Sequence, residues 1–399
     1  MNITGYHIST SLIATSDSKI RREPPWLDFL FDGKGETIKV AYHLDYAVAN
    51  LLLMMEIPEP QLRELNDKGE LRFRGYRFKY IPKKFFSMAY GSQFAVFSDM
   101  AQYMDNWTLH SEYDERPEDL ALRKAHVAQQ IGIEVYDALT KLGLHPKSLV
   151  SPISAFEKEI LSKMDLPTLE DIPEEAAEYA YNCTHGPWVE CYQKGWFKDT
   201  EDYDQKSAYP HQLSQLIDLR RGNWVKNEKY EGQAYYGYAK GMVNITADFS
   251  PIVYSKTEEQ NFTPKGQWET YLTKEEIDFI DKYKLGSFEI YDGWWFFPDE
   301  IVKPLEGIMN WLYSKKEEAK GLERKVLKRI ASGCWGKLLE VNHDGELGGY
   351  FNSVWGVEVE SRTRLEVARF VLDNNLQDNL LSIAVDGVLV SKGNRQSAN

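Results

Sequence analysis

Two aspartates stand in strand-like settings far apart in the chain. Asp204 opens the run Asp204–Pro210, and Asp386 lies within Ile383–Val390. Between them, Lys328–Gly336 is a basic helical stretch that ends in an aromatic residue and a glycine. Phosphoryl transfer needs divalent cations, and hard cations such as Mg²⁺ require only one or two carboxylates besides the substrate phosphates. This order of carboxylate, cationic helix and carboxylate predicts metal-dependent nucleotidyl transfer.

The surroundings of Asp386 favour a metal ligand. We predict an apolar strand over Leu380–Val390, and an unpaired carboxylate within such a strand is unfavourable. A bound cation would explain why the charge is there. A hydrogen-bonded turn aspartate at Asp386-Gly387 would explain it as well.

Tyr209 is the next candidate. We expect Pro210 to end the strand that carries Asp204, because proline removes a backbone donor, and this leaves the Tyr209 ring near the carboxylate. A rigid ring there can press on the sugar of a nucleotide and exclude the 2′-hydroxyl that separates RNA from DNA precursors. Packing in the core is the alternative role for a single tyrosine.

Three lysines form the third feature. Lys316 and Lys320 are spaced at i and i+4, which predicts one face of a helix, and Lys328 follows in the next helical segment. Cations on adjacent helices can hold a triphosphate electrostatically. A solvated helix face is the alternative for such a run of charge.

Mixed secondary structure must position these residues. Residues 1–150 have the pattern of mixed α/β structure, with a long helix predicted over Pro117–Leu142 from apolar residues at helical spacing. Gly143 suits the left-handed position that ends such a helix. Later in the chain strands dominate, followed by two helical segments at Asp299–Lys320 and Leu322–Lys337.

Composition excludes few functions. A chain of 399 residues can form two or three domains, and 43% hydrophobic with 27% charged residues is typical of soluble globular proteins. The net charge of −14 argues against nonspecific coating of nucleic acid, although a local basic groove remains compatible with it because salt screens distant charges. Three cysteines without a CxxC pair, no signal peptide and no long apolar run predict a cytoplasmic protein.

The two aspartate segments resemble motifs of the family B DNA polymerases, of the phage or viral type. Asp204-x-x-Ser207-x-Tyr209-Pro210 resembles motif A of that family. Val385-Asp386 resembles the second half of motif C, Tyr-x-Asp-Thr-Asp-Ser, and the first aspartate of that motif is replaced by alanine here.

The basic helix extends the resemblance. Lys328–Gly336 is similar to motif B, Lys-x-x-x-Asn-Ser-x-Tyr-Gly, with Ser332, Gly333 and Trp335 in place of the Asn, Ser and Tyr. Tyr313-x-x-Lys316 is similar to the fingers helix that supplies cations for the triphosphate. Motifs B and C are weak individually, and the order and spacing of all three make the match specific.

The resemblance implies roles for these residues. Asp204 and Asp386 would be catalytic, and together with Gln205 they would hold two Mg²⁺ ions, with Mn²⁺ as an alternative. Tyr209 would be the sugar gate, and the partners would be a DNA primer–template and deoxynucleoside triphosphates. The substrate-binding residues would be Tyr209, Ser207, Lys316, Lys320, Lys328 and Ser332.

The resemblance also implies the fold, which combines α+β and α/β domains. An RNase-H-like exonuclease-type domain would precede a polymerase palm with an antiparallel sheet and helical fingers. The exonuclease carboxylates are replaced: Ser9–Ser11 occupies the Asp-x-Glu position, Ala47 stands at the second motif, and the third retains Asp137 or, in a shifted register, Gly132. Two-metal hydrolysis cannot run on one carboxylate, so we predict no proofreading.

The predicted domain boundaries follow the motifs. The chain ends at Asn399, 13 residues beyond Asp386, where family members continue into a thumb. We therefore expect that the thumb is absent, and that it lies on a second polypeptide or has been removed by truncation. The expected parts are an inactive exonuclease-like domain at 1–165, a linker at 166–200, the palm at 201–298 and 338–399, and the fingers at 299–337.

Three functions compete on this evidence. The first is a DNA-directed DNA polymerase without proofreading, and the second is a catalytically weak polymerase-like scaffold that binds DNA or a partner chain. The third is an unrelated metal-dependent enzyme. Retention of Asp204, Tyr209, Lys328 and Asp386 together favours the first, because a scaffold has no physical need for all four.

Overall fold

The chain forms two compact units in a computed structural model, which describes residues 2–9, 11–22, 26–31, 37–103, 116–257, 260–341 and 345–392. The first unit comprises Met1–Met164 and Lys315–Ile330, and the second comprises Asp165–Ser314 and Ala331–Asn399. The segment 299–337 is therefore divided between the two units rather than forming a compact unit of its own.

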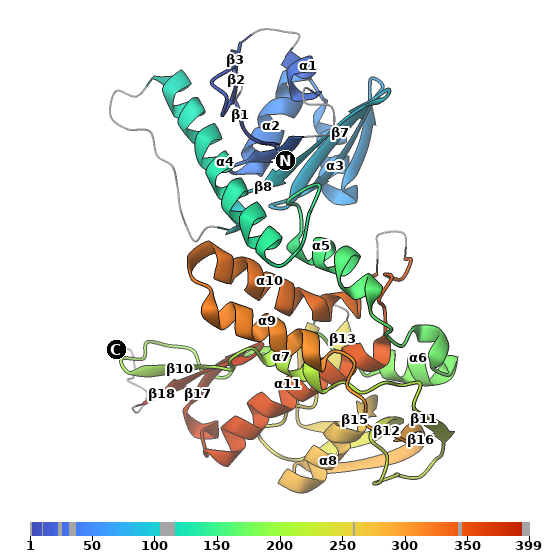
Figure 1. The fold of residues 1–399 in the computed structure, drawn as a ribbon. Coiled ribbons are helices and arrows are strands. Elements are labelled where there is room, and N and C mark those ends of the chain that lie inside the picture. The colour runs from blue at the N-terminus through green and yellow to red at the C-terminus, as the bar shows by residue number, and fades with distance from the viewer. Residues whose placement is uncertain are drawn as a thin grey trace. The chain divides into compact units, whose positions relative to one another are not determined.

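The first unit is built on an eight-stranded mixed sheet with the order β3-β2-β1-β4-β8-β7-β6-β5 (Figure 1). The pairs β1–β4 and β4–β8 are parallel, and the other neighbours are antiparallel. The strands are β1 (Asn2–Ile8), β2 (Ile13–Thr15), β3 (Ile20–Arg21), β4 (Thr37–Ala41), β5 (Glu70–Phe73), β6 (Tyr76–Ile81), β7 (Phe85–Tyr90) and β8 (Gln93–Asp99).

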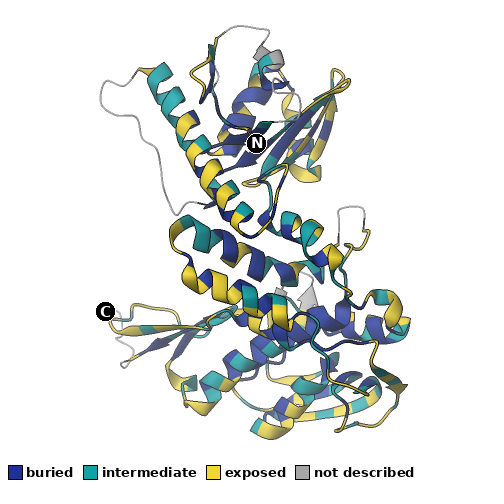
Figure 2. Ribbon diagram, viewed as in Figure 1, coloured by how far each residue is buried: buried dark blue, intermediate teal, exposed yellow. Residues whose placement is uncertain are grey.

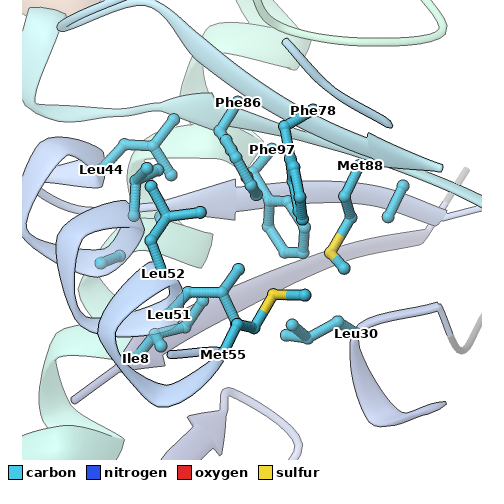
Figure 3. Close-up of a cluster of buried hydrophobic side chains, with 14 of the residues drawn as sticks. Ile8, Leu30, Leu44, Leu51, Leu52, Met55, Phe78, Phe86, Met88 and Phe97 are labelled. Atoms are coloured by element: carbon cyan, nitrogen blue, oxygen red, sulfur yellow. The ribbon is translucent and has the colours of Figure 1, made fainter. Parts of the chain in front are cut away.

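Helices flank this sheet and close its core. The helix predicted over Pro117–Leu142 is confirmed as α4, with proline in its first turn and Gly143 beyond it at a φ of 78°. Figure 3 shows aromatic side chains of the sheet, Phe78 and Phe86 among them, packed with aliphatic side chains of α2. The helices are α1 (Trp26–Phe31), α2 (Leu44–Met54), α3 (Glu59–Lys68), α4 (Pro117–Lys141) and α5 (Pro152–Glu159), with short 3₁₀ turns at Ala101–Tyr103 and Leu161–Lys163.

Residues 315–330 are tied into the first unit by side-chain contacts. Lys141 Nζ lies 2.7 Å from the Glu323 carboxylate. The Arg329 guanidinium lies 5.1 Å from the centre of the Tyr103 ring. Through these contacts Glu323 and Arg329 of α10 attach to the N-terminal part of the chain. This explains why residues 315–330 belong to the first unit.

The second unit contains antiparallel sheets only, among the described residues. One four-stranded sheet has the order β10-β18-β17-β9, a second has the order β11-β16-β12-β15, and β13 pairs with β14. The strands are β9 (Val189–Cys191), β10 (Thr200–Asp204), β11 (Gly222–Lys226), β12 (Tyr236–Ile245), β13 (Tyr254–Thr257), β14 (Gln260–Phe262), β15 (Gly266–Thr273), β16 (Gly286–Pro298), β17 (Leu380–Ala384) and β18 (Gly387–Ser391).

The helix α11 runs through the centre of the second unit and is buried along most of its length (Figure 2). The Asn352 side chain caps its N-terminus by accepting a hydrogen bond from the Trp355 N–H at 3.0 Å. The helices of this part are α6 (Glu174–Asn182), α7 (Ala208–Gln215), α8 (Lys274–Tyr283) and α11 (Ser353–Asp373), with 3₁₀ turns at Leu169–Asp171 and Gln377–Asn379.

Two further helices, α9 (Glu306–Glu318) and α10 (Gly321–Lys337), correspond to the predicted helical segments. The first prediction, Asp299–Lys320, was too long at both ends. Pro304 disfavours helical backbone before it, and the helix begins only two residues later. It ends at Glu318, and Gly321 follows with a φ of 54°.

Candidate active site

Asp204 and Asp386 come together at one end of the sheet β10-β18-β17-β9. Asp204 is the last residue of β10 and pairs with Gly387, the first residue of β18. Asp386 lies in the two-residue turn that joins β17 to β18, and its carbonyl accepts a hydrogen bond from the Gln205 N–H at 3.0 Å. The Asp204 Oδ1 atom lies 3.7 Å from where a side chain on Gly387 would begin. The two aspartates are therefore immediate neighbours in space.

The setting of Asp386 corrects the sequence-based expectation. The strand predicted over Leu380–Val390 is a hairpin of two strands, and Asp386 occupies its turn rather than the interior of a strand. The side chain is half-buried, and that of Asp204 is exposed. The argument from an unpaired carboxylate inside an apolar strand does not hold, and the turn position that was the alternative is the one observed.

The backbone is strained beside both aspartates. Val385, the first residue of the turn, has a φ of 63°, and Ser207, three residues after Asp204, has a φ of 59°. Positive φ is rare for a β-branched residue such as valine. Strained positions of this kind cluster at functional sites, where surrounding contacts hold them in place. Here the Val385 N–H donates to the Trp188 carbonyl at 2.7 Å.

Tyr209 packs against the aromatic residue of the motif B-like segment. Its ring centre lies 4.8 Å from that of Trp335, with 36° between the planes. Burial, together with the nearby carboxylates of Glu360 and Asp386, raises the pKa of the Tyr209 hydroxyl to about 12. We expected Pro210 to end the strand, and this is wrong. The strand stops at Asp204, and Pro210 lies in the first turn of α7.

Gln205 brings a third carboxylate to this region. Its side-chain amide nitrogen donates to Glu366 on α11, and its Oε1 atom is buried without a hydrogen-bond partner among the described residues. Glu366 carries no motif signal, because only the tertiary packing of α11 brings it beside β10. Sequence reasoning therefore missed it.

A buried ionic network on α11 lies behind the site and was also missed. The Arg364 guanidinium contacts Glu276 of α8 at 2.6 Å and Glu360 at 3.1 Å, and all three residues are almost fully buried. The Glu360 carboxylate also accepts the His185 N–H at 2.8 Å. The network thus joins α8 and the segment before β9 to the helix whose Glu360 faces Tyr209. The sequence signal for this network is a set of charged residues at helical spacing. Such a set more often forms a solvated helix face, so it does not indicate burial.

The remaining motif residues of the second unit lie on α9, α10 and the segment after β10. The Lys206 ammonium lies 5.5 Å from the centre of the Tyr313 ring on α9. Ser332 is half-buried on α10, three residues before Trp335. Ser207 precedes α7 and is half-buried.

Lys316, Lys320 and Lys328 belong to the first unit, so their place beside the aspartates stays a prediction. The helix-face argument for the first two is wrong, because α9 ends at Glu318 and Lys320 lies beyond it. Lys316 is buried, with 9% of its surface exposed. Lys328 is exposed on α10.

The donors at this sheet end fit a hard divalent cation. Two neighbouring carboxylates and an amide oxygen without a partner are the oxygen ligands that Mg²⁺ accepts, and substrate phosphates complete such sites. Within the described ranges no cluster of three or more histidine, cysteine, aspartate or glutamate side chains could hold a metal. A site of two carboxylates, Asp204 and Asp386, is therefore the arrangement at this sheet end among the described residues.

The positions predicted for exonuclease carboxylates do not all converge in the first unit. Ala47 lies one turn before Asn50, whose side chain donates to the Ile8 carbonyl at 3.2 Å, whereas Asp137 lies apart from Ser9. Ser9 follows the C-terminal end of β1. The N-terminal end of β1 lies beside α4 at Gln129, whose side chain donates to the Ile3 carbonyl at 2.7 Å. Asp137 is exposed two turns further along α4, beyond the opposite end of β1. Ala47 is buried in the core, and Thr10 lies outside the described residues.

Other proteins share this fold. No known family model and no curated protein sequence matches the chain. Among solved structures, phi29 DNA polymerase matches with a TM-score of 0.66 at 12% identity, covering 99% of this chain and 81% of that one. Its complex with primer–template DNA matches with a TM-score of 0.64 at 13% identity, covering 99% and 81%.

The complex of phi29 DNA polymerase with primer–template DNA and incoming nucleotides matches with a TM-score of 0.61 at 12% identity, covering 99% and 80%. The chain has a fold of the phi29 DNA polymerase type. This establishes a mixed α/β multidomain architecture over nearly the whole chain, and it confirms the fold implied by the sequence resemblance at that level. None of the helices in the described part combines the length and hydropathy that a membrane span requires.

Proposed function

We propose that the chain is a template-directed DNA polymerase that adds deoxynucleotides to a 3′-hydroxyl by two-metal phosphoryl transfer. The observation that carries this proposal is the strand register that places Asp204 beside the turn holding Asp386, within a fold of the phi29 polymerase type. Solved structures of that fold include complexes with primer–template DNA and incoming nucleotides, which we propose as the partners here.

In this proposal Asp204, Gln205 and Asp386 hold the metal ions. Two Mg²⁺ ions, or Mn²⁺ in their place, supply charge neutralisation at the attacking and leaving oxygens when bound. The backbone hydrogen bond from Gln205 to Asp386 fixes the turn against the end of β10. Exposure of Asp204 leaves its carboxylate accessible to a cation that would also bind the triphosphate.

Tyr209 is the proposed sugar gate. Contact with Trp335 restricts the ring, and a restricted ring excludes a 2′-hydroxyl more sharply than a mobile one. The raised pKa keeps the Tyr209 hydroxyl protonated near neutral pH, so it can donate a hydrogen bond. We assign nucleotide contacts on the motif resemblance alone to Ser207, Lys316, Lys320, Lys328 and Ser332.

We further propose that the first unit is an RNase-H-like domain that does not proofread, and that the second contains the palm, with fingers formed by α9 and α10. The separation of Ser9 from Asp137 along β1 and α4 supports the loss of proofreading, because two-metal hydrolysis needs carboxylates that converge.

A catalytically weak scaffold subunit is the second candidate. The observation that favours it is Ala384, which pairs with Gly387 at the sheet end where motif C of the family has its first aspartate. A scaffold of this kind would bind DNA or a partner chain and would not need a metal.

Extension of a labelled primer–template by the purified chain with Mg²⁺ and deoxynucleotides separates the two. We expect extension by the wild type that Asp386→Asn reduces about a hundredfold, since one of the two carboxylates proposed as metal ligands is lost. The matched control is Asp202→Asn, which neutralises an exposed aspartate on the same strand two residues before Asp204.

Loss of extension in both variants would indicate general damage rather than a metal site. DNA binding without extension by the wild type, in Mg²⁺ and in Mn²⁺ and with no rescue by added partner extract, would reject the polymerase in favour of the scaffold.

A further inference from the structure

A basic surface lies on the β5–β6 hairpin of the first unit, among residues to which no function has been assigned above. Residues 68–84 carry seven lysines or arginines and one glutamate, in a chain with a net charge of −14. Arg72, Arg74 and Arg77 are exposed. Lys79 on the same hairpin pairs with Glu70 at 3.3 Å, whereas the three arginines have no carboxylate partner in the described part of the chain.

The strand register aligns two of these arginines with an exposed aromatic ring. Arg72 pairs with Arg77, Arg77 pairs with Ala89, and Ala89 pairs with Phe94, so the row crosses the four neighbouring strands β5 to β8. Directly opposed residues share one face of a sheet, and adjacent strands are about 4.8 Å apart. The row therefore presents two guanidinium groups, a small residue and a ring on one face. We call this row, together with Arg74 at the hairpin tip, the hairpin surface.

The composition of the hairpin surface is unfavourable without a ligand. Like charges directly opposite each other destabilise a strand pair. Phe94 is 59% exposed, although a phenylalanine contributes most to folding when it is buried. Both unfavourable features are relieved by a ligand that is anionic and has flat apolar faces.

The hairpin surface is also hollow and has a defined tip. A surface cavity of about 580 Å³ is lined by the three arginines and Ala89, and Ala89 is the strand neighbour of Phe94. The turn residues Arg74 and Gly75 have φ values of 48° and 84°, the conformation of a tight hairpin turn that usually takes asparagine or aspartate at its first position. The Arg74 guanidinium lies 4.9 Å from the Phe73 ring centre, which holds it beside the cavity.

We propose that the hairpin surface binds single-stranded DNA without sequence preference, with phosphates on Arg72, Arg74 and Arg77 and a base stacked on Phe94. Grooves that bind single strands combine cations along the backbone with aromatic platforms for successive bases. The bases of a duplex are stacked on one another, so a duplex would contact the arginines and would not stack a base on Phe94. This site is separate from the residues proposed for nucleotidyl transfer, and it can exist whether or not the chain is a polymerase.

Fluorescence anisotropy with a labelled oligo(dT) of about 12 nucleotides tests the proposal on the full chain. We expect Phe94→Ala to weaken binding about tenfold and Phe94→Tyr to preserve it, because the ring supplies the stacking. For single strands each phosphate contact contributes about 0.7 to the slope of log K against log salt, so Arg72→Ala with Arg77→Ala should lower that slope by about 1.4.

The matched control is Arg63→Ala on α3, an exposed arginine of the same unit that pairs with Glu59 at 2.6 Å. It should leave both the affinity and the salt slope unchanged, and circular dichroism checks that every variant is folded. Oligo(dT) carries no primer–template junction, so the outcome of this binding assay is independent of the primer-extension test of the polymerase assignment.

Equal affinities for the wild type and the hairpin variants would overturn the proposal. So would a loss confined to blunt duplex DNA or to anionic phosphatidylserine vesicles, since either would assign the arginines to a different ligand.

Discussion

The strained turn beside Asp386 should lower the stability of the folded chain, and a substitution at Val385 tests this. Its φ of 63° is unfavourable for a β-branched side chain, and asparagine tolerates this region. We expect Val385→Asn to raise the free energy of unfolding by about 1 kcal/mol in urea denaturation. The control is Val225→Asn in β11, at ordinary φ, which should not stabilise the protein because asparagine is disfavoured in strands. A destabilised Val385→Asn protein would show that the valine side chain contributes more by packing than the turn loses by strain.

Single residues were predictable where a motif preserved their order. Asp204, Tyr209 and Asp386 could be selected because their residue types and spacing match a known pattern. Glu366 and Arg364 could not, because helical spacing on α11 gives no sign of which charged residues are buried or which element they face. Their contacts depend on packing between elements distant in sequence.

At the scale of elements, the buried network makes α11 depend on one cation. Arg364 neutralises Glu276 and Glu360, all three nearly inaccessible to water. Arg364→Met should lower the free energy of unfolding by about 3–5 kcal/mol, because two buried carboxylates lose their partner. The control Arg63→Met disrupts an exposed pair and should change it by less than about 1 kcal/mol. Similar effects of the two substitutions, measured by urea denaturation, would show that the network is dispensable.

The strand β1 carries a pH-dependent contribution to stability through His7. Burial lowers the pKa of His7 to about 4, with Lys124 adding to the effect, and the side chain is 9% exposed. The unfolded chain binds a proton near pH 6.5 and the folded chain does not until about pH 4, so stability from this group is present above pH 6.5 and lost between those values.

Urea denaturation at pH 7 and pH 5 checks this contribution. The wild type should lose about 2 kcal/mol more than His7→Gln between the two values, as a group with this pKa shift requires. His126→Gln, at an exposed position on α4, should behave like the wild type. Identical pH dependence in the wild type and His7→Gln would mean that the buried imidazole titrates normally.

The hairpin that carries Asp386 shows why element boundaries were harder to predict than element types. Leu380–Val390 contains a continuous apolar pattern, which favoured one strand. The hairpin signal that it does contain, Asp386-Gly387, stands one residue beyond the observed turn Val385-Asp386. Pairing of β17 with both β9 and β18 enforces the turn against the preference of valine. The helix α4 has clear end signals, proline at its start and glycine after its end, and it was placed within one residue.

At the scale of the whole molecule, the order of the motifs indicated which distant segments meet. It did not indicate how the chain divides into two compact units. The pairing of β10 with β18 joins segments that lie on either side of α9 and α10 in the chain, as the order of motifs A and C implied. The grouping of residues 315–330 with the first unit rests on contacts such as Lys141 with Glu323, for which exposed charges give no sequence signal.

Metal dependence is the last prediction, and the charge of the whole chain shapes its test. A net charge of −14 attracts divalent cations diffusely, so a shift in melting temperature with Mg²⁺ does not by itself identify a site. A specific site stabilises the folded chain by RT ln(1 + [Mg²⁺]/Kd), about 1.4 kcal/mol at ten times Kd, and the effect saturates. We expect a saturable rise in melting temperature in the wild type at constant ionic strength, reversed by EDTA.

The variants decide between site binding and diffuse attraction. Asp204→Asn and Asp386→Asn should each abolish the saturable component, whereas Asp202→Asn removes the same charge from the same strand and should retain it. Diffuse attraction would decline equally in all three, because each loses one negative charge. Equal melting curves for the three variants in Mg²⁺ would therefore remove the two aspartates from the metal site, and with them the proposed mechanism, even if the chain binds DNA.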